Sequence, residues 1–229
     1  MHRSVLKAAA LILFPALVFL SPRGVFAQEV QGTGSPYIVN QMPSAAMSFS
    51  LYSFYSTQQE QAYLKFEYFV LQQHTQLTEL VFWGAAGYNI PLTELSDNFY
   101  FIIYPEKDCK PSGHPAQQED NALFSVQIPT ASDRFNNSTN PESRFNRIII
   151  DLKEYDIVLP SGVYWFTLYF DNRFFDYGFN WQLSDKRNRP AWHFNLTNDF
   201  FNATGVRPGE FYDILQSNYA FVLRGDALD

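Results

Sequence analysis

The sequence has little cysteine and little histidine, and it lacks two common hydrolase motifs. Cys109 is the single cysteine among 229 residues, so no internal disulfide can form and a multi-thiolate zinc site is excluded. The four histidines, His2, His74, His114 and His193, show no metal-ligand spacing. No Gly-x-Ser-x-Gly or His-Glu-x-x-His motif is present. We therefore expect packing, rather than covalent or metal links, to hold the fold together.

A long membrane-spanning run is also missing. The apolar stretch at residues 8–20 has about 13 residues, whereas a transmembrane helix needs roughly 20. Arg3 and Lys7 precede this stretch, and Val25 and Ala27 offer small side chains to a signal protease. This order is typical of a secretory signal, so we predict a signal peptide over residues 1–27, cleaved after Ala27. The prediction implies a secreted, extracellular or periplasmic protein without membrane association after cleavage.

Positive charge is scarce. The chain has 16 basic and 23 acidic side chains, a net charge of −7. Three of the basic residues, Arg3, Lys7 and Arg23, and none of the acidic ones fall in residues 1–27, so the expected mature chain has 13 basic and 23 acidic side chains, net −10. An acidic surface repels phosphate groups, so we predict no nucleic-acid partner.

Aromatic residues, by contrast, are abundant. The chain has 23 Phe, 14 Tyr and 4 Trp, which supply large apolar surfaces for a core. Residues 163–170 carry aromatic and β-branched side chains on both faces, which predicts a central strand covered on both sides. No segment keeps a helical period over three turns. Further strands are expected at 63–71, 77–83, 98–104, 122–128, 144–152, 178–183, 191–196 and 218–224.

This pattern predicts an all-β protein. We expect a single antiparallel β-sandwich, jelly-roll-like, with about nine or ten strands over residues 57–229. Residues 28–56 are rich in Gly, Ser, Pro and Gln, and they predict an extended lead-in that adds edge strands near 37–39 and 47–55. Residues 129–143 and 197–217 are polar or irregular and predict loops.

Six stretches carry strand motifs in a recognisable order: FEYFVL (66–71), LTELVFWG (77–84), DNFYFIIY (97–104), LPSGVYW (159–165), FNWQ (179–182) and AFVLRG (220–225). Together they resemble a jelly-roll-like β-sandwich domain of secreted bacterial proteins, a type often found upstream of C-terminal sorting or anchoring tails. Phe66 and Glu67 stand where that family has an acidic pair, and we expect no anchoring tail after the last motif. The resemblance implies a fold and a compartment, and no defined activity.

Catalysis by paired carboxylates has little support in the sequence. Glycoside hydrolysis needs two carboxyl groups facing across a cleft, and the strand carboxylates are Glu67, Glu79 and Asp151. Glu67 alternates with the side chains expected to point inward, so we expect it to face solvent. Cys109 and His114 share a predicted loop, where an exposed, unpaired thiol is expected rather than a nucleophile. We assign no catalytic residues and keep an extracellular polysaccharide hydrolase as the alternative function.

Tryptophan offers the better indication of function. The C–H face of a sugar ring packs on an indole, and neighbouring polar side chains bind its hydroxyl groups. The predicted ligand-binding residues are Trp181, Trp192, Tyr177, Gln182 and Asp185. The competing interpretation places these indoles in the core, as we expect for Trp83 and Trp165.

Metal binding has a weak signal. The loops at 94–98 and 171–176 are rich in oxygen ligands for Ca²⁺, yet neither has EF-hand spacing. We predict no metal site and no cofactor, and keep a structural Ca²⁺ ion as the alternative. We predict a secreted, non-enzymatic binding or structural module with a glycan or cell-surface component as its partner. A subunit of a surface assembly is a further alternative, which a large exposed apolar patch would support.

Overall fold

The strand β11 (Gly162–Asp171) lies at the centre of a sheet, as the sequence predicts. In the computed structural model it pairs with β3 (Gln61–Leu71) along one edge and with β5 (Asn98–Lys107) along the other. Its residues 164–170 are all buried, because both faces of this strand are covered. The Tyr164 hydroxyl donates a 2.8 Å hydrogen bond to the Pro160 carbonyl, and this bond fixes the turn that precedes the strand.

The structure describes residues 36–44, 50–56, 61–86, 97–115, 121–132, 135–139, 145–171, 179–185, 191–196, 209–212 and 218–229. The chain divides into two units, residues 1–30 and 31–229. The first unit, and with it the predicted signal peptide, lies outside the described residues. The described residues all belong to the second unit.

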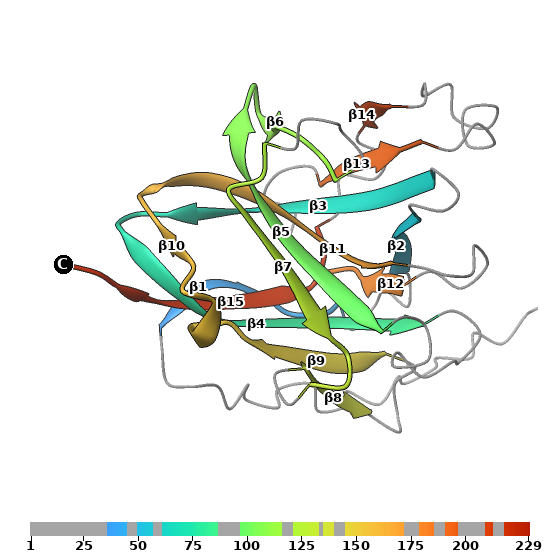
Figure 1. The fold of residues 1–229 in the computed structure, drawn as a ribbon, viewed down its shortest axis with the longest axis horizontal. Helices are drawn as coiled ribbons and strands as arrows, with labels where there is room; N and C mark the ends of the chain where they lie inside the picture. Colours follow the sequence, from blue (N-terminus) through green and yellow to red (C-terminus); the bar gives the residue numbers. More distant parts are fainter. Residues whose placement is uncertain are drawn as a thin grey trace, which may run out of the picture. The chain divides into compact units, whose positions relative to one another are not determined.

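Two sheets make up this unit (Figure 1). Sheet I contains β8 (Phe135–Thr139), β9 (Asn146–Asp151), β4 (Thr75–Ala86), β15 (Phe221–Ala227) and β1 (Tyr37–Gln41) in that order, with β10 (Val158–Leu159) and β12 (Phe179–Gln182) also paired to β4. Sheet II contains β7 (Phe124–Pro129), β5, β11, β3, β13 (Trp192–Asn195) and β14 (Glu210–Tyr212) in that order. The strand β2 (Ser50–Ser56) pairs with β12, β3 and β11 and so joins the two sheets.

The predicted fold class is confirmed and the predicted strand number is wrong. The described residues form fifteen strands rather than nine or ten, although β6 (Lys110–Pro111) and β10 have only two residues each. The strands β8 and β14 fall in segments that the sequence predicts as loops. Both are short and pair through their backbones with one neighbour, so they need no run of alternating apolar side chains. The pairing of β2 with β11 is parallel, whereas every other described strand pairing is antiparallel.

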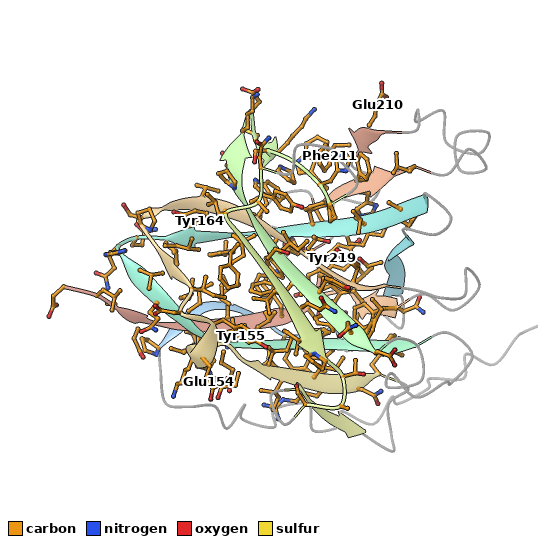
Figure 2. The ribbon with its side chains drawn as sticks, viewed as in Figure 1. Glu154, Tyr155, Tyr164, Glu210, Phe211 and Tyr219 are labelled. Carbon is orange, nitrogen blue, oxygen red and sulfur yellow. The ribbon has the colours of Figure 1, made fainter. Side chains whose placement is uncertain are left out.

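Aromatic rings from both sheets meet in the core between them (Figure 2). Phe166 of sheet II contacts Trp181 and Phe221 of sheet I, with ring centroids 5.5 and 4.8 Å apart. On its own sheet it contacts Phe69 and Phe101 at 6.1 and 5.7 Å. These tilted and edge-on contacts are the arrangement that aromatic quadrupoles favour, and they join the two layers without any covalent link.

A second apolar cluster lies on the other face of sheet II. It contains Ala62, Leu64, Phe66, Ile102, Tyr104, Trp165, Tyr169 and Phe194, all buried. Sheet II is therefore apolar on both faces. The alternating side chains of β3 and β11 therefore point to two buried faces, rather than to one buried face and one solvent-exposed face.

Gly84 of β4 is a position where the backbones of two strands come too close for a side chain. A Cβ atom there would lie 2.7 Å from the Asn180 carbonyl oxygen and would overlap the ring of Phe179, which is fully buried. We expect Gly84→Ala to lower the free energy of unfolding by about 1–3 kcal/mol, measured by urea denaturation. Gly162→Ala is the control, since its nearest contact is the Tyr164 hydroxyl at 3.1 Å. An equal effect at the two sites would contradict the close approach of β12 to β4.

Candidate functional site

Four half-buried aromatic rings lie on the face of sheet II that points away from sheet I. They are Tyr68, Tyr100, Trp192 and Phe211, and we call them the outer aromatic surface. Cross-strand pairing places them on one face, since Tyr68 pairs with Trp165 and Tyr100 with Tyr169. Figure 2 labels Phe211, the member on β14.

The rings of the outer aromatic surface rest on buried rings of the same face. Tyr100 stacks on Tyr169 with centroids 4.9 Å apart and planes 3° apart. Tyr68 lies 5.5 Å from Trp165, and Phe211 lies 5.4 Å from Phe66. Packing against buried neighbours fixes the orientation of each ring before any ligand arrives, which lowers the entropic cost of binding.

Polar groups border this surface at the tip of a β-hairpin. Asp108 and Cys109 have φ angles of 53° and 61°, the left-handed conformation that a two-residue type I′ turn between β5 and β6 requires. This turn brings the Cys109 carbonyl within 2.9 Å of the Trp192 Nε1 donor and Lys110 Nζ within 4.9 Å of the Trp192 ring. Trp165 Nε1 donates a 3.3 Å hydrogen bond to Glu106 of the same hairpin.

A chain of polar side chains lies inside the sandwich, on the opposite face of β3 and β13. We call Lys65, Glu67, His193, Asn218 and Tyr219 the inner polar cluster, and all five are buried. Lys65 Nζ lies 3.2 Å from His193 Nδ1, and His193 Nε2 lies 2.7 Å from the Tyr219 hydroxyl. Glu67 accepts hydrogen bonds from the Tyr219 backbone N–H at 2.5 Å and from Asn218 Nδ2 at 3.1 Å. Figure 2 labels Tyr219 near the middle of the sandwich.

Burial sets the charge state of the inner polar cluster. Desolvation raises the pKa of Glu67 to about 8, although hydrogen bonds from Tyr219, Asn218 and other donors act to lower it. Desolvation also holds the pKa of Lys65 well below its usual range. The pKa of His193 is well below its usual range as well, first through desolvation and then through the neighbouring Lys65 charge. The arrangement thus favours neutral side chains in the core.

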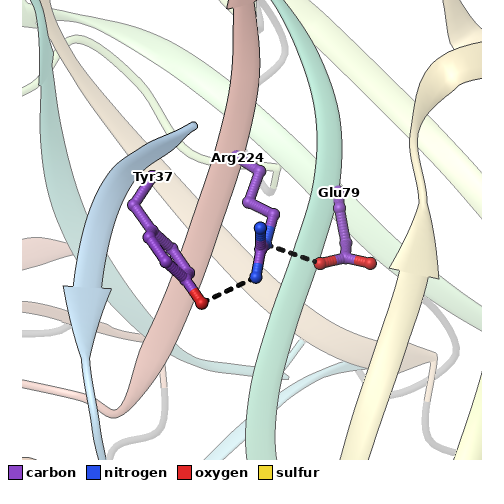
Figure 3. A network of polar contacts seen from close by, with 3 residues as sticks. All are labelled: Tyr37, Glu79 and Arg224. Carbon is purple, nitrogen blue, oxygen red and sulfur yellow. Dashed lines mark hydrogen bonds and ion pairs between the residues drawn. The ribbon is translucent and has the colours of Figure 1, made fainter. Parts of the chain in front are cut away.

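A separate ionic group lies on the outer face of sheet I (Figure 3). Arg224 Nε is 3.1 Å from Glu79 Oε1, and Arg224 Nη2 donates a 2.7 Å hydrogen bond to the Tyr37 hydroxyl. Burial raises the pKa of Glu79, while Arg224 and then Arg147 act to lower it. Asp151 is the cross-strand neighbour of Glu79. This pair is two carboxylates side by side, but Glu79 is buried and ion-paired, unlike the open arrangement that glycoside hydrolysis needs.

The structure separates the predicted ligand-binding residues. Trp181 has no exposed surface, stacks on Tyr219 at 4.7 Å and donates a 2.9 Å hydrogen bond to the Ala220 carbonyl, so its indole is a core residue and cannot receive a sugar. Gln182 is also buried. Asp185 is exposed and Trp192 is half-buried, on the outer aromatic surface. Tyr177 lies outside the described residues. Trp165 is buried as expected, whereas Trp83 is half-buried.

The expectation that Glu67 faces solvent is wrong, since its side chain has no exposed surface. The even-numbered residues of β3 looked like its inward set, but they cover the outer face of sheet II, and Glu67 points into the core between the sheets. The polar residues Lys65 and Glu67 within an otherwise aromatic strand were the available signal. Because both faces of β3 are buried, these two side chains had to be buried whichever face they occupied.

The structure bears on the predictions about metal ligands and about the Cys109 thiol. Among the described residues no group of three or more His, Cys, Asp or Glu side chains is positioned to hold a metal ion. Most of the two oxygen-rich loops, 94–98 and 171–176, lies outside them. Cys109 is exposed, as expected, and His114 is buried with its ring stacked on Phe194 at 3.5 Å.

Comparison with known proteins assigns this chain to no family. No protein family, no curated protein and no solved structure matches this chain. Within the part of the chain that the structure describes, no helix has the length and apolar character needed to cross a membrane.

Proposed function

We propose that this protein is an exported β-sandwich module that binds carbohydrate through the outer aromatic surface. The observation that carries the proposal is the group of four half-buried rings on one face of sheet II, fixed by buried rings beneath them. Sugar rings pack their C–H faces on such side chains. The order of the six strand motifs supports placing the chain among secreted bacterial jelly-roll-like domains, and the signal peptide predicted at residues 1–27 supports the exported location.

The polar border of the surface supplies the hydrogen-bonding groups that a sugar requires. Glu106 is half-buried and Lys110 is exposed, and both lie on the hairpin beside the rings. Rings alone would also suit an apolar partner. A carboxylate and an ammonium group next to the rings favour a ligand with many hydroxyl groups, which accept and donate at once.

The proposal is tested with a panel of insoluble polysaccharides and a glycan array, using the full mature chain. Trp192→Ala and Tyr100→Ala are expected to weaken retention about tenfold or more, since each removes a ring on which a sugar would stack. The matched control is Trp83→Ala, a half-buried tryptophan on the outer face of sheet I. Equal retention of all three variants, or no retention of the unaltered protein by any glycan, would contradict the proposal.

A hydrolase remains the alternative, and the described residues offer one observation that bears on it. Glu79 and Asp151 are cross-strand neighbours, yet Glu79 is engaged by Arg224. A release of reducing sugar from a bound polysaccharide that disappears in Asp151→Asn would favour the hydrolase over the binding module.

A further inference from the structure

The strands β13 and β14 form a thin edge of sheet II. The strand β13 has four residues and β14 has three, and β14 is the last strand in the order of this sheet. The backbone pairing of β13 with β3 spans four residue pairs. Short edge elements open locally at a lower free energy than the sheet centre, so side-chain contacts largely decide whether this edge stays closed.

On its inner face β13 is held by His193. The Nδ1 atom of His193 contacts Lys65 of β3, and its Nε2 atom contacts Tyr219, which lies two positions before β15. A lysine ammonium group only donates hydrogen bonds, so the Nδ1 atom facing it must be an acceptor and the ring must be neutral. A proton added at Nδ1 would point an N–H at an ammonium group. If Lys65 is neutral instead, the proton still places a charge in an apolar core.

Two other titratable groups of β3 lie beside the His193–Lys65 pair in the part of the chain that the structure describes. They are Glu67, which burial keeps protonated and uncharged up to a pKa of about 8, and Tyr63, whose ring lies 3.8 Å from Lys65 Nζ. Tyr212 of β14 lies directly opposite His193 in the strand register.

On its outer face the same strand is held by a second histidine. The buried His114 ring stacks on Phe194 of β13 at 3.5 Å and meets Phe211 of β14 edge-on at 5.9 Å. Its Nδ1 atom is buried without a hydrogen-bond partner among the described residues, and burial lowers the pKa of His114 to about 4. A charged imidazole at this place would have to leave the aromatic rings for water.

We propose that β13 and β14 form an acid-released edge, kept closed at neutral pH by the uncharged rings of His193 inside the sandwich and His114 outside it. Both histidines take up a proton more readily once the edge has opened, so falling pH favours the open form. Because Trp192 lies on β13, acid release would also remove this ring from the outer aromatic surface. The proposal concerns the fold and does not depend on the ligand.

The direction of the pH effect on opening follows from the lowered pKa values of His193 and His114. A histidine whose pKa is lowered in the closed state gives stability that is present above its ordinary value of about 6.5 and lost as the pH falls below it. Each histidine then favours opening by about tenfold for each pH unit below about 6.5. With both acting, the opening constant of the edge rises roughly a hundredfold between neutral pH and about pH 5.5.

Hydrogen exchange of the full chain, read by mass spectrometry and corrected for the intrinsic pH dependence of amide exchange, tests this directly. Protection of β13 and β14 is expected to fall roughly a hundredfold at about pH 5.5, while protection of β4 and β9 is retained. His193→Gln keeps one acceptor and one donor and should reduce the loss to roughly tenfold, as should His114→Gln. The double variant should show no loss from this source, and the exposed His74→Gln is the control.

Three outcomes would overturn the proposal. They are unchanged protection of β13 at low pH, an equal loss across all strands, and a loss in the double variant as large as in the unaltered protein. Should His193→Gln fail to fold, His114→Gln alone still tests the proposal, since an unchanged loss of protection in this variant would contradict the role of the His114 ring on Phe194.

Discussion

Replacing Trp181 with alanine is expected to lower the free energy of unfolding by about 3–5 kcal/mol, the largest effect of any single truncation discussed. The indole is fully buried and contacts Tyr219, Phe166 and Phe221 at 4.7, 5.5 and 6.5 Å. Its removal leaves a cavity where rings of both sheets meet and leaves the Ala220 carbonyl without its indole donor. Urea denaturation measures the loss, with the m-value checking that the transition stays cooperative.

Two further variants separate packing from other roles of this tryptophan. Trp181→Phe keeps most of the ring volume but no N–H donor, so it should cost only about 1–2 kcal/mol. Trp192→Ala truncates a half-buried indole and should cost less than Trp181→Ala. A Trp181→Ala protein as stable as the unaltered chain would show that the indole is not a core residue, and would restore it as a ligand-binding candidate.

Glu67 gives the second large effect, and it depends on pH. Its pKa is raised from 4.5 to about 8 in the folded state, so the folded chain holds one proton more than the unfolded chain between these values. The stability contributed by this group is therefore lost as the pH rises through that window. At 1.36 kcal/mol for each pKa unit, the loss approaches roughly 4–5 kcal/mol above about pH 8.

The contribution of Glu67 appears most clearly as a difference between two proteins. Lys65 and His193 have lowered pKa values and give the opposite slope, so the unaltered chain alone can show a flat profile. Glu67→Gln has no titratable group at this position, and subtracting its free energy of unfolding at each pH isolates the carboxyl. Glu154→Gln, at an exposed position labelled in Figure 2, controls for the loss of one negative charge. A difference that stays constant from about pH 4.5 to 8.5 would contradict the burial of an uncharged Glu67.

Much of the fold was predictable because strands with bulky side chains have a strong sequence pattern. The segment 163–170 predicts a central strand, and the structure confirms it as β11. The edge strands β8 and β14 were missed, since Phe135-Asn-Asn-Ser-Thr139 has no apolar alternation and is recognised by its backbone pairing with β9. Propensity and periodicity report a run of bulky or alternating side chains, and residues 135–139 and 210–212 offer no such run.

The candidate site was less predictable for a different reason. Alternation distinguishes the two faces of a strand but does not say which faces the partner sheet when both are buried. Trp181 and Trp192 have the same residue type and similar polar neighbours in the sequence, yet one is in the core and the other is half-buried. Lys65, His193 and Tyr219 are far apart in the sequence. The pairing of β13 with β3 brings His193 to Lys65, and the packing of the two sheets adds Tyr219.

The pairing of β15 with both β1 and β4 has a consequence for how the chain matures. Tyr37 and Arg224 are in contact across 187 positions of sequence, so sheet I is incomplete until the C-terminal residues have left the ribosome. Closing a loop of this length before its contacts form makes folding slow. Sheet I is therefore expected to fold only after β15 has been synthesised, rather than during synthesis of the strands before it.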